Sequence, residues 1–200
     1  MKERPIIFSG PMVRAILDGR KTQMRRVAKY NPFLGEPSEW GDRAKNQEPE
    51  FVRIAGDYRR FCHYGQPGDR LWVREKIELS VMIGDWAESC YSADGAPTVA
   101  DAWPWKQNHL SPLHCPRGLS RITLELVNVR VERVQDISEA DAKAEGVQKA
   151  SICDDAQCDD DFGPMNYADG YQIVWESIHG QGSWAANQWV WVLEFKRVAP

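Results

Sequence analysis

The sequence has no long hydrophobic run. None of its segments approaches the roughly 18 consecutive apolar residues that a membrane-spanning helix requires. The first residues also lack the apolar segment of a secretory signal. These two absences predict a cytoplasmic protein with no membrane partner.

Cysteine is sparse and poorly spaced for a metal site. The chain has five cysteines and four histidines, and it contains no C-x2-C pair. Standard zinc sites use closely spaced pairs of this kind, and disulfide frameworks usually hold an even number of cysteines. We therefore expect reduced thiols, no metal site and no cofactor. Neither the composition nor the spacing predicts an oligomeric state.

The chain also lacks a positive net charge. Its formal charge is −4, so non-specific attraction to nucleic acid should be weak. The charge is uneven, however. Residues 1–30 carry eight Lys and Arg against two acids, whereas residues 136–161 carry nine acids against two Lys. Any recognition of nucleic acid should therefore be local.

The clearest local feature is a basic segment at residues 20–26, where Arg20, Lys21, Arg25 and Arg26 occur together. It follows a short apolar helix that ends at Gly19. A basic cluster in an acidic protein is a candidate anion-binding site, and phosphate is the commonest such anion. The alternative is a solvated helix end, whose cations face the negative pole of the helix dipole.

Hydrophobic periodicity predicts an α+β protein with about five or six strands and two or three short helices. Gly, Pro, Ser and Asn residues mark the expected turns and helix caps. Strands are expected at 5–8, 70–76, 121–134 and 189–196, and helices at 12–17, 138–146 and 166–179.

Three of these segments carry more detailed predictions. In 121–134 the apolar positions are first even, at Leu124 and Leu126, and then odd, at Val129, which predicts a bulge or bend. In 189–196 aromatic and apolar residues alternate with Val, Glu and Lys, which predicts one core-facing side. In 166–179, one apolar face is expected at Tyr171, Val174, Trp175 and Ile178.

A single domain over residues 1–200 fits this length. Three segments show little periodicity and are predicted to be irregular insertions, at about 29–63, 80–118 and 148–165. Within them, short strands are expected at 51–54 and near Cys90.

Several short motifs in a fixed order resemble the ASCH domain, a member of the PUA-like superfamily, in the version carried by phages and prophages. The resemblance covers residues 4–28, 64–77, 117–147 and 171–197. The motifs are Gly-Arg-Lys-Thr at 19–22, Pro-Gly-Asp-Arg-Leu-Trp-Val-Arg-Glu at 67–75, Ile-Ser-Glu-Ala-Asp at 137–141, Trp-Glu-Ser-Ile at 175–178 and Trp-Val-Trp-Val at 189–192.

The resemblance implies a small curled PUA-like β-barrel in a bacterial host's cytoplasm, with a cleft beside Gly-Arg-Lys-Thr that takes RNA, DNA or a modified nucleoside. One bacterial branch hydrolyses N4-acetylcytidine with a Lys, a Thr three residues later and a Glu at the end of a short helix. By position these become Lys21, Met24 and Glu145. A thioether cannot be the nucleophile. Thr22 would share a face with Met24 in an extended segment, so it is the remaining candidate hydroxyl.

Two further sets of residues are candidates for nucleic-acid contact. Arg25 and Arg26 could bind phosphate or a base edge, or alternatively form salt bridges within the fold, for example to Glu75. Trp72 could stack on a base or pack in the core. The complete predicted set for nucleic-acid binding is Arg20, Arg25, Arg26, Trp72, Arg74, Arg117 and Arg121.

Four functions remain open from the sequence. The first is recognition of nucleic acid or a modified nucleoside at Lys21, Arg25, Arg26 and Glu145. The second is an amidohydrolase that deacylates an N-acylated cytidine, with Lys21, Glu145 and Thr22 as its catalytic set. The weaker alternatives are a nuclease and a phage antagonist of a host protein. Whether the protein is an enzyme is therefore left open.

Overall fold

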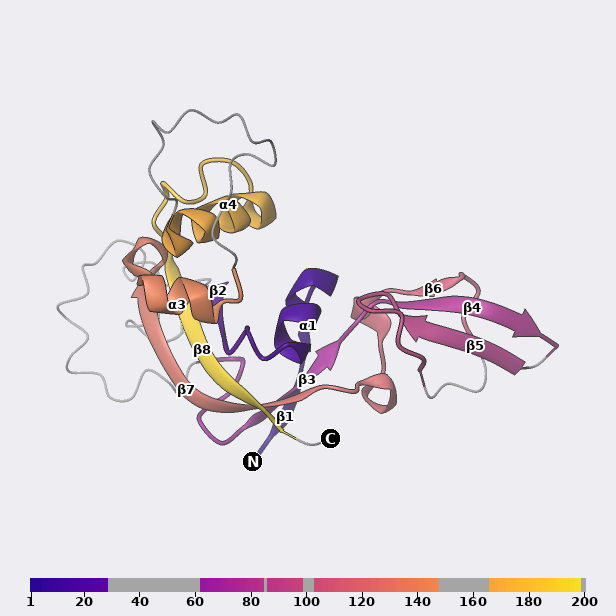
Figure 1. Ribbon diagram of the computed structural model, residues 1–200. Coiled ribbons are helices and arrows are strands. Elements are labelled where there is room, and N and C mark those ends of the chain that lie inside the picture. The colour runs from indigo at the N-terminus through magenta and orange to yellow at the C-terminus, as the bar shows by residue number, and fades with distance from the viewer. Residues whose placement is uncertain (29–61, 85, 99–102, 148–165, 199–200) are drawn as a thin grey trace, which may run out of the picture. The chain divides into compact units, whose positions relative to one another are not determined.

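The computed structural model describes residues 1–28, 62–84, 86–98, 103–147 and 166–198 (Figure 1). Helices and strands are both present, so the predicted α+β class is confirmed. The chain divides into two compact units. Unit 1 comprises Met1–Gly19, Pro67–Val127 and Phe195–Pro200, and unit 2 comprises Arg20–Gln66 and Asn128–Glu194. The predicted strand at 51–54 and the insertion at 148–165 lie outside the described residues, as does most of the one at 29–63.

The larger sheet has the strand order β1-β3-β7-β8-β2. Strand β1 runs parallel to β3, whereas the pairs β3–β7 and β2–β8 are antiparallel. Strands β7 and β8 each contribute residues to both units. No closed barrel is found among the described strands. The strand bounds are β1 Glu3–Ile7, β2 Gln23–Val27, β3 Arg70–Arg74, β7 Thr123–Arg133 and β8 Trp189–Val198.

In unit 1, strand β3 is buried more deeply on one face than on the other. Leu71 and Val73 are fully buried, whereas on the opposite face Trp72 is 9% exposed and Arg70 and Arg74 are half-buried. Helix α1 (Gly10–Leu17) begins with Pro11 in its first turn, a position where the missing N–H costs nothing. The sequence predicted both elements, although α1 begins two residues earlier than expected.

The segment 80–118 was predicted to be irregular apart from a short strand near Cys90. That strand is confirmed, because residues 86–91 form one, but the segment also contributes to a second, three-stranded sheet that the sequence did not predict. Its order is β5-β4-β6, with β4 at Ile77–Ile83, β5 at Trp86–Tyr91 and β6 at His109–Leu110. The pairing register shifts between Leu79 and Val81, which interrupts the alternation that would reveal a strand. The 3-10 helices η4 (Pro112–His114) and η5 (Arg117–Leu119) follow.

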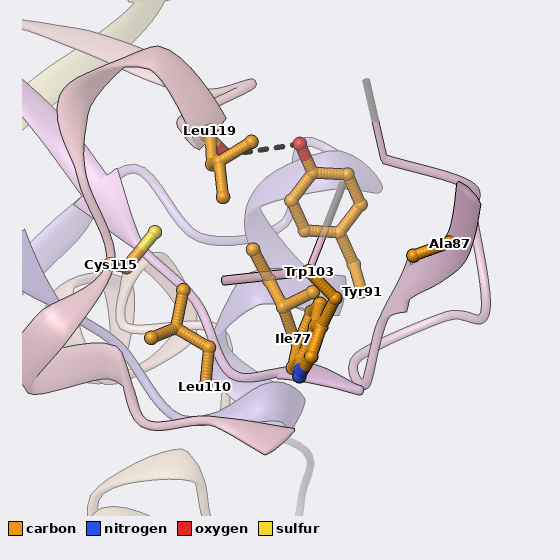
Figure 2. Packing of buried hydrophobic residues seen from close by; sticks show 7 residues of the cluster. All are labelled: Ile77, Ala87, Tyr91, Trp103, Leu110, Cys115 and Leu119. Carbon is orange, nitrogen blue, oxygen red and sulfur yellow. Dashed lines mark hydrogen bonds between the residues drawn. The ribbon is translucent and has the colours of Figure 1, made fainter. Parts of the chain in front are cut away.

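This second sheet has its own hydrophobic cluster (Figure 2). The Tyr91 hydroxyl donates to the Leu119 carbonyl at 3.0 Å, so its polar end is satisfied inside the cluster. The Trp103 indole N–H donates to the Gln107 carbonyl at 2.7 Å. The cluster comprises Ile77, Ala87, Tyr91, Trp103, Leu110, Cys115 and Leu119.

Unit 2 packs two helices against strand residues. Helix α4 (Tyr167–His179) has a reciprocal N-terminal cap between Asn166 and Asp169. Tyr171 and Trp175 are buried as predicted, but Ile178 is 53% exposed because it lies in the last turn of the helix. The 3-10 helix η6 (Val134–Asp136) and helix α3 (Glu139–Ala144) also contribute to this core. The complete cluster comprises Val134, Ile137, Ala142, Tyr171, Trp175, Val190 and Val192.

Two strands explain how the sequence pattern relates to burial. In β7, Leu124 and Leu126 are buried, Val127 is 53% exposed and Val129 is buried again, so the predicted change of parity is confirmed. In β8, the prediction of one core-facing side is wrong over Val190–Leu193, where both faces are buried. Val190 and Val192 pack in the helical cluster of unit 2.

No described helix is long and apolar enough to cross a membrane.

Candidate functional site

A buried ion pair joins the basic segment to the end of helix α3 in unit 2. Lys21 forms an isolated antiparallel bridge with Glu145. The Lys21 Nζ donates to the Glu145 Oε2 at 2.7 Å and to the Glu145 backbone carbonyl at 2.8 Å. The two side chains are 2% and 5% exposed. The structure therefore brings together the two residues that the resemblance implies as the catalytic cation and carboxylate.

The position of Glu145 is set by helix α3, which is capped at its N-terminus and ends at Glu145. The Ser138 hydroxyl accepts from the backbone N–H of Asp141 and caps the first turn, as the sequence predicted. Glu145 is the C-cap residue, and its N–H donates to the Asp141 carbonyl at 2.8 Å. The Thr22 N–H donates to the Ala144 carbonyl at 2.9 Å, so the basic segment is tied to the end of the helix by backbone hydrogen bonds.

Arg25 contacts three carboxylates from a fully buried side chain. Its Nη2 lies 3.0 Å from the Glu132 Oε2 and 3.3 Å from the Asp141 Oδ2. Its Nη1 lies 3.3 Å from the Glu145 Oε1. A planar guanidinium can serve several acceptors at once, which an ammonium cannot do with the same geometry. The Arg25 side chain has no exposed surface, so its charge faces these carboxylates rather than solvent.

Gln23 completes the contacts around Arg25. With its amide oriented to satisfy both polar atoms, the oxygen accepts from the Arg25 Nη1 at 2.7 Å and the nitrogen donates to the Asp141 Oδ1 at 3.0 Å. Lys21, Gln23 and Arg25 occupy every second position of the segment, and all three are buried. Strand alternation therefore presents the three side chains on one face.

Arg130 extends the network on strand β7. It forms ion pairs with Glu132 and Glu194, and its Nη2 lies 3.1 Å from the Asp141 Oδ1. The seven charged groups connected in this way are three cations and four carboxylates, a balance of 3 − 4 = −1. The cations of the network are therefore compensated by carboxylates of the same unit. Its members are Lys21, Arg25, Arg130, Glu132, Asp141, Glu145 and Glu194.

Burial and charge shift two pKa values in this network. Desolvation lowers the pKa of Lys21; the Glu145 carboxylate opposes that shift, and repulsion from Arg26 and Arg25 adds to it. Burial acts to raise the pKa of Asp141, but Arg130 and Arg25 outweigh it and leave that pKa below its ordinary value. Lys21 therefore gives up its proton more readily than a solvated lysine.

One buried donor of the network, the Arg25 Nε, has no acceptor in the described part of the chain. Buried donors are normally paired. The Lys21 ammonium donates two of its three N–H groups to Glu145.

The other residues of the basic segment differ in exposure. Thr22 is exposed, whereas Met24 is 2% exposed. Met24 lies within β2, opposite Leu193, while Thr22 precedes the strand. Arg20 is exposed, and its Nη1 lies 3.3 Å from the Gly146 carbonyl. Arg26 is half-buried.

Trp72, Arg74 and Arg117 belong to unit 1. Trp72 is 9% exposed, which favours the core-packing interpretation over base stacking. The Arg74 guanidinium lies 4.8 Å from the Trp72 ring centroid, and that of Arg117 lies 6.0 Å from it. Arg117 also forms an ion pair with Glu3 at 3.1 Å.

Arg121 is the cation that pairs with Glu75, not Arg25 or Arg26 as the sequence suggested. Its Nη2 lies 2.8 Å from the Glu75 Oε2, and its Nη1 lies 2.8 Å from the Asp94 Oδ2. The guanidinium also covers the Tyr91 ring at 3.9 Å. Glu75 is only 2% exposed, so this pair neutralises a carboxylate buried within unit 1.

Sequence reasoning missed five polar members of the unit 2 site, namely Gln23, Arg130, Glu132, Asp141 and Glu194. Spacing provided a signal for three of them. Arg130 and Glu132 are two residues apart on a strand, and Asp141 and Glu145 are four apart on one face of α3. What the sequence did not reveal is that these faces meet.

Comparisons with protein-family profiles, with curated proteins and with solved structures found no match. The resemblance to ASCH domains therefore rests on the ordered motifs alone.

Proposed function

We propose that this protein is a PUA-like ASCH module, with the curled barrel that this resemblance implies, and that it recognises a modified nucleoside at the Lys21–Glu145 pair. The observation that carries the proposal is the buried contact of 2.7 Å between the Lys21 Nζ and the Glu145 carboxylate. Burial of two opposite charges is costly, and such pairs concentrate at functional sites.

The pairing of charges supports a nucleoside rather than a phosphate backbone as the ligand of this pair. Lys21 and Arg25 are both paired with carboxylates of unit 2. A phosphate would have to compete with these carboxylates for the two cations, whereas a neutral base would not. The third N–H of Lys21, beyond the two that it donates to Glu145, suits the carbonyl oxygen or ring nitrogen of a base.

Calorimetric titration tests this proposal, with N4-acetylcytidine and cytidine as probes. We expect the wild-type protein to bind at least one of them, and Lys21→Met to weaken that binding by about tenfold or more. Lys143→Met is the matched control, because Lys143 is exposed on the same helix end that carries Glu145. Equal affinities in wild type and Lys21→Met would overturn the proposal, as would an absence of binding to either nucleoside.

A second candidate function, amide hydrolysis of an N-acylated cytidine, is favoured by the lowered pKa of Lys21. A lysine that readily gives up its proton can act as a general base near neutral pH. Met24 cannot be a nucleophile, so the attacking group of this proposal is water. Lys21 would take a proton from the water while the water oxygen bonds to the acetyl carbonyl carbon. The C–N bond would then break and the proton would pass from Lys21 to the leaving nitrogen, giving cytidine and acetic acid, which ionises to acetate.

Chromatography of the nucleoside products separates binding from catalysis. If the protein is an amidohydrolase, cytidine accumulates with the wild type and is reduced by about a hundredfold or more in Glu145→Gln, which keeps the shape but removes the charge beside Lys21. If N4-acetylcytidine binds in calorimetry and stays intact, the protein is a binding module. Cytidine release that is equal in wild type and Glu145→Gln would contradict the assignment of this pair as catalytic.

Nucleic-acid contact by unit 1 remains a proposal for Arg74 and Arg117. The Arg74 side chain has no carboxylate partner among the described residues and donates to the Leu113 carbonyl. Arg117 pairs with Glu3, but the side chains of that pair are 40% and 39% exposed, so the pair is accessible to a phosphate. Accessible cations can exchange counterions for phosphate. Charge reversal in Arg74→Glu is expected to weaken binding of a single-stranded RNA, measured by fluorescence anisotropy, several-fold.

A further inference from the structure

We propose that Arg25 is a positioning residue of the unit 2 site. It holds the carboxylate of Glu145 in the one orientation in which that group meets Lys21. This inference rests on the proposed function, because it concerns how the same site is organised.

The two oxygens of Glu145 have different cation partners. Its Oε2 lies 2.7 Å from the Lys21 Nζ, and its Oε1 lies 3.3 Å from the Arg25 Nη1. The terminal torsion of a glutamate is broad, so one contact alone leaves the carboxylate free to rotate. A second contact on the other oxygen fixes that rotation, and Arg25 provides it.

Arg25 can do this because several contacts hold its own guanidinium group in place. Glu132 and Asp141 hold its Nη2 at 3.0 and 3.3 Å, and the Gln23 amide oxygen accepts from its Nη1 at 2.7 Å. The guanidinium carbon lies 5.8 Å from the centroid of the Tyr171 ring. A lysine at this position would keep the charge but lose the planar fork that reaches several acceptors.

The charge of Arg25 also acts on Lys21. The charged groups that bear on the Lys21 ammonium are the Glu145 carboxylate after α3, and Arg25 and Arg26 on β2. Glu145 favours the charged ammonium, whereas the two arginines disfavour it. Removing the charge at position 25 therefore removes one repulsion, and that change raises the pKa of Lys21.

Two variants separate the geometric and the electrostatic parts of this role. Arg25→Lys keeps the charge, and Arg25→Gln keeps a planar donor without the charge. Nucleoside affinity is measured by calorimetry, and Lys21 is titrated through its ε-methylene NMR signal, which is assigned by its loss in Lys21→Met. Arg133→Lys is the control, because Arg133 is another arginine of unit 2 that contacts Asn187 and the Trp189 ring.

Arg25→Lys is expected to lower nucleoside affinity by about tenfold and to leave the titration of Lys21 close to that of the wild type. Arg25→Gln is expected to move the titration of Lys21 to higher pH. Arg133→Lys should change neither readout. A merely structural role would lower stability in both Arg25 variants without moving the titration of Lys21.

The proposal is overturned if folded Arg25→Lys binds nucleoside as the wild type does. It is also overturned if folded Arg25→Gln titrates Lys21 at an unchanged pH. Should Arg25→Gln not fold, the affinity of Arg25→Lys decides the matter. If the wild type binds no nucleoside, the proposed function fails, and the titration of Lys21 in Arg25→Gln still tests the action of the Arg25 charge on Lys21, because it requires no ligand.

Discussion

Lys21 is the residue on which the account depends, and its surroundings make a prediction about pH. Its pKa in the folded protein is lowered from about 10.4, the value in an unfolded chain. Between these two values the unfolded state binds more protons, so the Lys21 contribution to the free energy of unfolding rises with pH in that window. This gain in stability is absent at pH values below the lowered pKa of Lys21, and it is complete above about pH 10.4.

In Lys21→Met, the free energy of unfolding should therefore rise less with pH in this window than it does in the wild type. Urea denaturation at several pH values between 7 and 10.5 measures the free energy of unfolding. We expect that of the wild type to increase with pH relative to the free energy of Lys21→Met. Lys143→Met, at an exposed position, should instead follow the wild type at every pH. A constant difference between wild type and Lys21→Met would show that Lys21 titrates normally.

Met24 departs from the pattern of the acetylcytidine hydrolases, and it is buried opposite Leu193. Met24→Thr should lower the free energy of unfolding by about 2–4 kcal/mol, because it removes apolar volume and buries a hydroxyl. Met82→Thr is the matched control, since Met82 is 56% exposed and should shift stability by less than about 0.5 kcal/mol. Chemical denaturation gives both values. Equal effects would contradict the burial of Met24.

At the scale of elements, helix α3 is short but sets the position of Glu145. Ser138→Ala removes the side-chain cap of its first turn and should cost about 1 kcal/mol of stability, measured by urea denaturation. Ser177→Ala is the comparison, because Ser177 bonds a carbonyl within helix α4 and caps nothing. A Ser138→Ala variant as stable as the wild type would show that the cap does not support the helix.

Most elements with a regular pattern could be predicted from the sequence. The parity change in β7 and the caps of α3 and α4 are local features, written in neighbouring residues. Strand β8 was predicted as a strand but not as one buried on both faces. Its Val face packs with residues of helices α3 and α4, and alternation of residue types does not report such a covering layer.

The sheet of β4, β5 and β6 was missed for a related reason. Its register shift breaks the period of two, and its strand β6 has only two residues. For the site, the pairing of Lys21 with Glu145 followed from the resemblance, whereas the carboxylates around Arg25 did not. They come from β7 and α3, and only the tertiary fold brings these faces to one point.

At the scale of the whole molecule, the net charge of −4 and the two units predict two kinds of salt dependence. Nucleoside binding at the compensated network of unit 2 should change little between 50 and 500 mM salt. Any RNA binding by Arg74 and Arg117 of unit 1 should weaken steeply over the same range, because counterions are released from phosphate. Calorimetry and anisotropy measure the two affinities. Steep salt dependence of nucleoside binding would contradict the assignment of a neutral ligand to the network.

The most direct test of the central claim observes Lys21 itself while a nucleoside is added. Lysine ε-methylene NMR spectra are recorded during titration with N4-acetylcytidine, and the Lys21 signal is identified by its absence in Lys21→Met. The account predicts that the Lys21 signal shifts and saturates while exposed lysines such as Lys143 and Lys196 keep their positions. An unchanged Lys21 signal at saturating nucleoside would show that the buried pair is part of the fold and not a binding site.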